Sequence, residues 1–159
     1  MPKLLAFFPC DKVVIDQLQN NVSVSAIIEE VVAGIPEKLM PPPNGAVVPN
    51  NWTVFAMWHR DTSENTVPFV VMARFFSPNE KLLVQTSPPT RANFDNNTKT
   101  SQRVVLNLNG FPIGAPGICQ IALMMKADGE TDFSEVARFP VIVKHEIIAE
   151  SDNRTASDD

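Results

Sequence analysis

The stretch "NWTVFAMWHR", residues 51–60, decides the fold class because its apolar residues recur with a period of two. Side chains of a β-strand alternate between two faces, so each face takes every second residue. The two faces are Trp52, Val54, Ala56 and Trp58, and Thr53, Phe55, Met57 and His59. Both faces are largely apolar, which predicts a central strand that is covered at least in part on both sides. The row with Trp52 and Trp58 is predicted to be core rather than a stacking surface for sugars or proteins.

The same alternation recurs along the chain between clusters of turn residues. The further predicted strands are residues 67–76, 81–87, 103–110, 118–127 and 133–145. An Asp-Gly pair at 128–129 signals a hairpin between the last two of them. Residues 88–102 are polar and are predicted to be a loop.

The beginning of the chain is also predicted to be β-structure. Residues 12–16 and 21–28 flank a turn at Asn20 and Asn21, which suit a hairpin. A short helix over "AIIEEVVAGI", residues 26–35, is the one alternative, with Gly34 as its C-cap. The density of β-branched residues in this segment favours a strand.

This pattern predicts an all-β fold, an antiparallel β-sandwich of about 7–9 strands with an immunoglobulin/C2-like Greek key. The alternative is a small β-barrel. A proline-rich connection between residues 36 and 49 and the loop at 87–101 suit the crossovers of a Greek key better. Residues 1–148 are predicted to form a single domain. Residues 149–159 have no apolar side chain larger than alanine and are predicted to be a disordered acidic tail.

Charge and hydropathy exclude several classes of partner. The chain has 159 residues and a net charge of -5, and most of that charge lies in the tail. A nearly neutral body argues against a nucleic-acid-binding protein, which needs a basic face. Asp11 and Lys12 interrupt the first apolar run, and no run approaches the length of a membrane span, so we expect no signal peptide, no membrane partner and a cytoplasmic location.

The two cysteines are weak candidates for chemistry. Cys10 and Cys119 match no zinc or redox spacing, so we expect them to be free and buried, without a disulfide. Cys10 stands beside Asp11 and Lys12, and Lys12 could lower the pKa of a catalytic thiol at that position. A small residue at a strand end is the favoured interpretation. No catalytic residue is therefore assigned.

Three polar motifs could bind an ion, and each has a simpler explanation. His59 lies in "WHRD" beside Arg60 and Asp61, and His145 lies in "VKHE". A metal site needs three or four ligands, and the chain has two histidines. "DGETD" places Asp128, Glu130 and Asp132 at alternate positions, but it lacks the pattern of a calcium loop. Polar strand ends and a solvated hairpin tip are favoured, so no metal or cofactor is expected.

Two segments rich in glycine or proline complete the candidates. "NGFPIGAPG" contains Gly110, Gly114 and Gly117 but neither a lysine nor a following helix, so a turn is favoured over a phosphate-binding loop. "MPPPNGAVVP", residues 40–49, could be a polyproline ligand. A rigid crossover loop is the favoured interpretation.

Three stretches carry a resemblance to a known group of proteins. They are "FFPCDKVVIDQLQNNVSVSAIIEEV", "LNLNGFPIGAPGICQIALMMKADGE" and "ARFPVIVK". Together they resemble an uncharacterised bacterial family of small β-sandwich proteins, a domain of unknown function, over roughly residues 3–146. The chain departs from that pattern at Cys119, where an aromatic residue is commoner, and in having no tyrosine. The family has no agreed activity, so the resemblance implies a fold and not a mechanism.

The expected function is that of a non-enzymatic structural or protein-interaction module. Its partner is expected to be an unknown protein or a second copy of the chain, bound through an exposed sheet edge or face. The face with Phe55 and Met57 and the face with Trp52 and Trp58 are the candidates for that contact. A module that binds sugar or calcium at its loops is the alternative, and an enzyme dependent on Cys10 is a weaker one.

Overall fold

The structure, a computed structural model, describes residues 2–16, 18–61, 67–94 and 100–149. These residues form ten strands and one 3-10 turn. The strands are β1 (Lys3–Asp16), β2 (Asn21–Ile27), β3 (Glu30–Pro36), β4 (Val47–His59), β5 (Phe69–Phe76), β6 (Leu82–Gln85), β7 (Thr90–Ala92), β8 (Ser101–Pro112), β9 (Gly117–Ala127) and β10 (Ser134–Ile148). The turn, η1, is Glu37–Leu39. No helix of the described part is long and apolar enough to cross a membrane.

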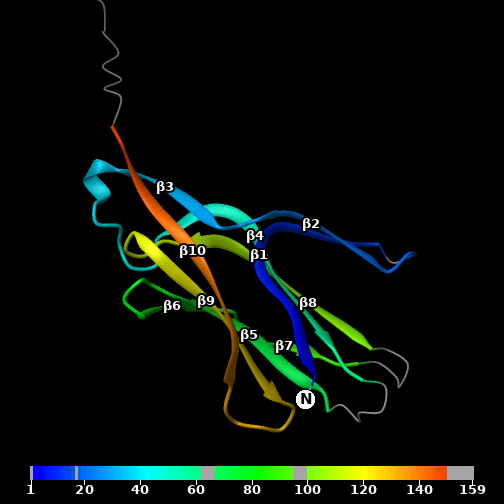
Figure 1. The fold of residues 1–159 in the computed structure, drawn as a ribbon. Coiled ribbons are helices and arrows are strands. Elements are labelled where there is room, and N and C mark those ends of the chain that lie inside the picture. The colour runs from blue at the N-terminus through cyan, green and yellow to red at the C-terminus, as the bar shows by residue number, and fades with distance from the viewer. Residues whose placement is uncertain (1, 17, 62–66, 95–99, 150–159) are drawn as a thin grey trace, which may run out of the picture.

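The strands form two sheets that pack against each other (Figure 1). Sheet A has four strands in the order β2-β1-β4-β8, and sheet B has the order β3-β10-β9-β5-β6, with β7 paired to β5. The prediction of an all-β fold built from two packed sheets is confirmed. The two sheets are separate ladders, so the alternative of a closed small barrel does not describe the fold. The predicted strand number is too low.

The core lies between the sheets and is centred on β4. Trp52 and Trp58 are each 1 % exposed, and their rings lie 5.1 Å from the rings of Phe75 and Phe69 on β5. The prediction that this face of residues 51–60 is core is therefore confirmed. The strand is also central, since β1 pairs on one side of it and β8 on the other.

One segment changes sheets and joins them along one side. β2 pairs with β1 in sheet A, and β3 runs parallel to β10 in sheet B. Between the two strands the Ile28 amide donates to the Pro9 carbonyl at 2.9 Å, and the Ile142 amide donates to the Glu29 carbonyl at 2.9 Å. The helix considered for residues 26–35 is wrong, because these backbone groups pair with two different sheets.

Two further predictions need correction. β1 begins at Lys3 rather than at residue 12, with Pro9 in its interior. Pro9 is tolerated because β2 begins to pair only at Cys10, so β1 is still an edge strand there. The predicted loop at 88–102 contains β7, and Ala92 and Phe94 of this segment are core residues. Nearly all of the predicted acidic tail lies outside the described residues.

Candidate functional site

On the outer face of sheet A, side chains from distant parts of the sequence lie next to one another in rows across the strands. Residues opposite each other in neighbouring strands share a face. Phe8 of β1 lies opposite Phe55 of β4, which lies opposite Val105 of β8. The Phe8 and Phe55 ring centroids are 5.4 Å apart. The next row along the strands joins Ala6, Met57 and Arg103 in the same way. We call Ala6, Phe8, Phe55, Met57 and Val105 the outer-face patch.

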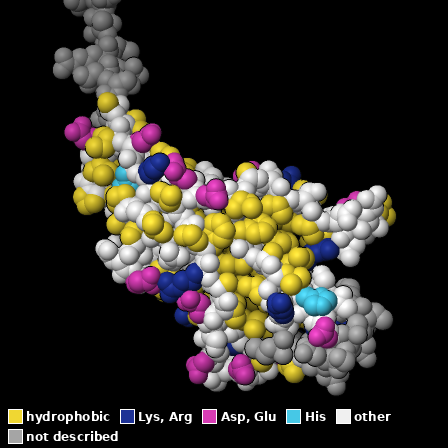
Figure 2. Space-filling model, in the orientation of Figure 1, with side chains coloured by type: hydrophobic (Ala, Val, Ile, Leu, Met, Phe, Trp, Pro, Cys, Tyr) yellow, Lys and Arg dark blue, Asp and Glu magenta, His cyan; other side chains and the backbone are white. Residues whose placement is uncertain are grey.

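The outer-face patch is a surface feature, because its members point away from the sandwich core. Figure 2 shows hydrophobic side chains gathered over β1 and β4, beside the β1–β2 hairpin. Phe55 is 3 % exposed because neighbours such as Phe8 cover it. Ala6, Phe8, Met57 and Val105 are only partly covered. The prediction that both faces of this strand are covered at least in part is confirmed.

On the outer face of sheet B, cationic side chains cover the apolar ones. Met72, Ala122 and Met124 form a small buried cluster on that face. Phe76 and Phe133 pack against the cluster, with the Arg138 guanidinium 5.2 Å from the Phe76 ring centre and Lys126 Nζ 5.0 Å from that of Phe133. Long cationic side chains can cover apolar surface with their stems while the charge stays in water. Sheet B thus seals its outer apolar cluster with its own cations.

A cation, Arg103, also borders the outer-face patch, but its guanidinium binds the tip of the β1–β2 hairpin and does not cover the patch. Arg103 of β8 donates to the Asn20 side-chain oxygen and to the Asn20 carbonyl, each at 2.8 Å. Asn20 is the turn residue of the β1–β2 hairpin, with a φ of 57°. The bidentate contact ties the tip of the hairpin to the edge of sheet A, and the guanidinium is directed to that tip.

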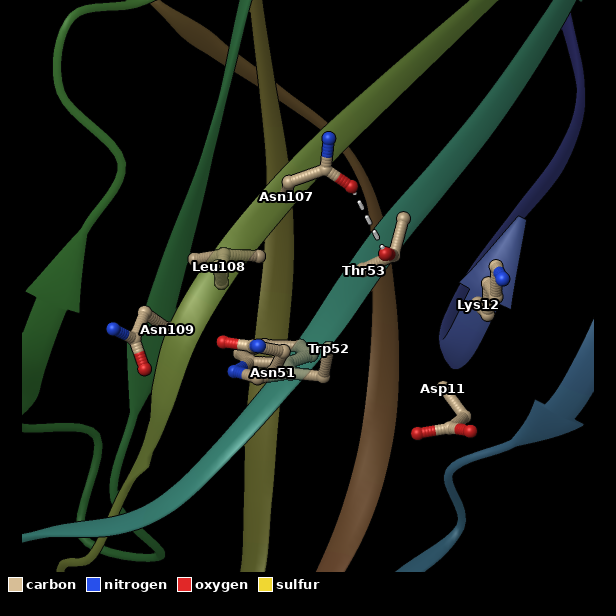
Figure 3. A pocket seen from close by; sticks show the side chains of 8 residues that line it. All are labelled: Asp11, Lys12, Asn51, Trp52, Thr53, Asn107, Leu108 and Asn109. Carbon is tan, nitrogen blue, oxygen red and sulfur yellow. Dashed lines mark hydrogen bonds between the residues drawn. The ribbon is translucent and has the colours of Figure 1, made fainter. Parts of the chain in front are cut away.

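A polar depression of about 530 Å³ continues the outer-face patch where β1 separates from β4. Figure 3 shows Asp11 and Lys12 on β1 at one side, and Thr53 and Asn107 on β4 and β8 at the other. Thr53 Oγ1 donates to Asn107 Oδ1 at 3.2 Å. Asn51 and Asn109 also line the depression. The outer face of sheet A therefore changes from apolar to amide-rich along its strands.

Cys10 lies at the boundary between these two regions. It is opposite Thr53 on β4 and Ile27 on β2, and it is fully buried. Burial, and after it the negative charge of Asp11, raise the pKa of the Cys10 thiol above its usual value. Burial likewise raises the pKa of Cys119, which packs in the core. Both cysteines are free, as predicted. An activated thiol needs the opposite shift.

We expect both thiols to react slowly in the native protein. A raised pKa reduces the thiolate fraction at neutral pH, and burial restricts access of the reagent. Labelling with a chromogenic disulfide at pH 7 should give slow reaction in native protein and two rapidly reacting thiols after denaturation, with a Cys10→Ser variant giving one. Rapid native labelling of Cys10, with a rate that titrates below pH 7, would instead indicate an activated nucleophile.

The residues of "WHRD" do not converge on one site. His59 Nε2 lies 3.9 Å from Asp61 Oδ1, and both side chains are well exposed. Arg60 is buried, with its guanidinium 5.1 Å from the centre of the Phe94 ring. Within the described ranges no group of three or more His, Cys, Asp or Glu side chains could hold a metal ion.

The acidic side chains at the hairpin tip pair with neighbouring groups of the protein. The Asp128 carboxylate pairs with Arg91 of β7, and Glu130 Oε2 accepts from the Ala127 amide at 3.1 Å. Lys126 Nζ donates to the Glu130 carbonyl at 2.8 Å. These contacts support the interpretation of "DGETD" as a hairpin tip between β9 and β10.

The glycine and proline segments meet at one end of the sandwich. Of "NGFPIGAPG", only residues 113–116 connect β8 to β9, because its first four residues belong to β8 and Gly117 begins β9; no helix follows it. The segment at 113–116, the prolines at 41–43 and His145 of β10 line one cavity together with the turn after β5. In the sequence, His145 and these prolines are separate motifs. Lys81 of that turn also lines the cavity, and no sequence motif marks it.

Comparison with known proteins adds no identification: no family model matches the chain, and a search of curated proteins finds no match.

Proposed function

We propose that this protein is a non-enzymatic interaction module that binds a second copy of itself through the outer-face patch. The observation that carries the proposal is the row Phe8–Phe55–Val105, which lies on an outward-facing sheet surface. Phe8 and Val105 remain partly open to solvent around the covered Phe55, and a contiguous apolar patch at the surface of a soluble protein commonly marks an interaction site. The cation-covered cluster on sheet B shows how this chain seals an apolar face that stays in water.

The border of the patch suits a second copy. In a two-fold symmetric contact the same surface meets itself, so it must be complementary to itself. The amides of Asn51, Asn107 and Asn109 each carry both donors and acceptors. Asp11 and Lys12 supply both signs of charge side by side. An apolar centre with such a polar rim is the usual anatomy of a protein interface.

The test is the molar mass of the protein in solution, because the contact would join two chains. We expect the wild type to dimerise with a dissociation constant below about 100 µM. Val105→Asp should give a folded monomer, since it places a charge in the centre of the contact. Phe55 is a less suitable position for this substitution, because it is nearly fully covered within one chain.

Ile142→Asp is the matched control for this experiment. Ile142 is also a β-branched residue on a paired strand, it is 43 % exposed, and it belongs to sheet B. The control variant should dimerise like the wild type. Self-association would be refuted if the wild type stayed monomeric in sedimentation equilibrium at several times about 100 µM. If the two variants changed the molar mass equally, the contact would lie elsewhere on the protein.

We further propose that the sandwich is immunoglobulin-like and that the chain belongs with the bacterial β-sandwich family it resembles. The strand order supports the first point. β4 and β8 are neighbours in one sheet, β10-β9-β5-β6 are neighbours in the other, and β3 runs parallel to β10. A cytoplasmic location is proposed on the two free cysteines, which persist in a reducing compartment.

A further inference from the structure

We propose that the cavity at the loop end of the sandwich binds a small organic acid, a molecule with an apolar body and one carboxylate. This inference is independent of the proposed self-association, because the cavity and the outer-face patch share no residue. The cavity has a volume of about 400 Å³. That volume lies within the range of small-molecule sites in proteins.

Three connections build this cavity, and a hydrogen bond and close packing hold them together. They are the proline segment at 41–45, the turn at 77–81 and the connection at 113–116, and all three lie on the left of Figure 1. The Ile113 amide donates to the Ala46 carbonyl at 2.8 Å, which joins the first connection to the third. At Gly114 an added Cβ would lie 2.9 Å from Leu83 Cδ1, so the third connection packs closely against β6.

The turn at 77–81 is itself well ordered by hydrogen bonds. The Ser77 amide donates to the Lys81 carbonyl at 2.9 Å, and the Lys81 amide donates to Ser77 Oγ at 3.2 Å. The Glu80 amide donates to the Ser77 carbonyl at 2.9 Å. These bonds hold the base of the Lys81 side chain in place. A cavity built from such a turn and from prolines is preformed, which lowers the entropy cost of binding.

The lining predicts the chemistry of the ligand. Its apolar part comes from the pyrrolidine rings of three consecutive prolines and from Leu83 and Ile113. Its titratable residues are Lys81 and His145, and no aspartate or glutamate lines the cavity. The described residues give the Lys81 ammonium no ion-pair partner. A cation beside apolar walls attracts an anion more strongly than it would in open water.

His145 gives a second, independent indication. It lies on the inward side of β10, after Val141 and Val143, and it is one of the residues that line the cavity. Its Nε2 is shielded from solvent and has no hydrogen-bond partner in the described part of the chain. A buried polar atom without a partner is unusual and costly. Rotation about the Cβ–Cγ bond, whose torsion is broad for histidine, would bring this nitrogen to a bound carboxylate.

The experiment compares an acid with its neutral amide. The probes are 3-phenylpropionate and 3-phenylpropionamide, titrated into the full-length protein at pH 7 by calorimetry. We expect the acid to bind at least about tenfold more tightly than the amide, as for a charge-assisted hydrogen bond. Lys81→Met should remove this difference, because it keeps an apolar side chain of similar length and loses the charge.

Lys144→Met is the matched control. Lys144 is adjacent to His145, points away from the cavity and pairs with Glu30 at 2.8 Å. This variant should bind the acid like the wild type. Equal affinities for acid and amide, unchanged acid binding by Lys81→Met, or displacement of the acid by an equal concentration of inorganic phosphate would each overturn the proposal. So would absence of acid binding at about 10 mM, a concentration that would fill most of a site with a millimolar dissociation constant.

Discussion

Replacing Trp52 with alanine should lower the free energy of unfolding by about 3–5 kcal/mol, the usual cost of a large aromatic residue deleted from a core. Trp52 is 1 % exposed, and its ring contacts those of Phe75 and Phe111 at 5.1 Å and 4.9 Å between centroids. Its Nε1 donates to the Gly110 carbonyl at 3.0 Å. Urea unfolding followed by circular dichroism measures the change, and a loss below about 1 kcal/mol would contradict the assigned packing.

Trp52→Phe separates the two contributions of this side chain. Phenylalanine keeps most of the apolar contact and removes the indole donor, which leaves the Gly110 carbonyl without that partner. We expect a loss of about 1–3 kcal/mol from the unsatisfied carbonyl and the smaller ring. If Trp52→Phe were as damaging as Trp52→Ala, the hydrogen bond rather than the packing would dominate at this position.

Replacing Gly110 with alanine is expected to cost about 2–4 kcal/mol. Gly110 has a φ of 80°, a left-handed conformation that is unfavourable for residues with a Cβ. An added Cβ would also lie 3.0 Å from Val47 Cβ, which is close to the backbone and cannot move far. The cost of the backbone strain at Gly110 and the cost of the close contact with Val47 add, because the first is local and the second involves another strand.

Gly45→Ala is the matched control for Gly110. Gly45 has a φ of 81°, and an added Cβ there would meet no heavy atom within 4 Å. Its substitution should therefore show the conformational cost alone, about 1–2 kcal/mol. The difference between the two variants measures the contact with Val47. Equal losses in thermal or urea unfolding would mean that the strand around Val47 moves to accept the methyl group.

Most of the fold follows from period-two patterning, since alternation survives wherever one face of a strand is buried. The core row of β4 and a strand within residues 67–76, observed as β5, were predicted on this basis and are confirmed. The failures have local causes. Pro9 conceals the first half of β1 because proline is uncommon within sheets. β7 has three residues, too few for a period to show.

The candidate sites were less predictable, because each depends on contacts between distant segments. Phe55 was predicted to lie on one of two largely apolar faces of its strand, but its partners Phe8 and Val105 come from strands whose register the sequence does not state. His145 and the proline segment were each considered alone. Their shared cavity arises only when β10 and three connections meet at one end of the sandwich.

The parallel pairing of β3 with β10 has a consequence for the order of folding. Glu30 pairs with Ile142, so β3 acquires its sheet-B partner only after nearly the whole described chain has been synthesised. Pairings between distant segments are slow because a long loop must close before any contact forms. During synthesis β3, which is rich in β-branched residues, would remain without its partner β10 while the strands that follow it leave the ribosome. We expect refolding on a timescale of milliseconds to seconds, with hydrogen-exchange protection appearing last in β3.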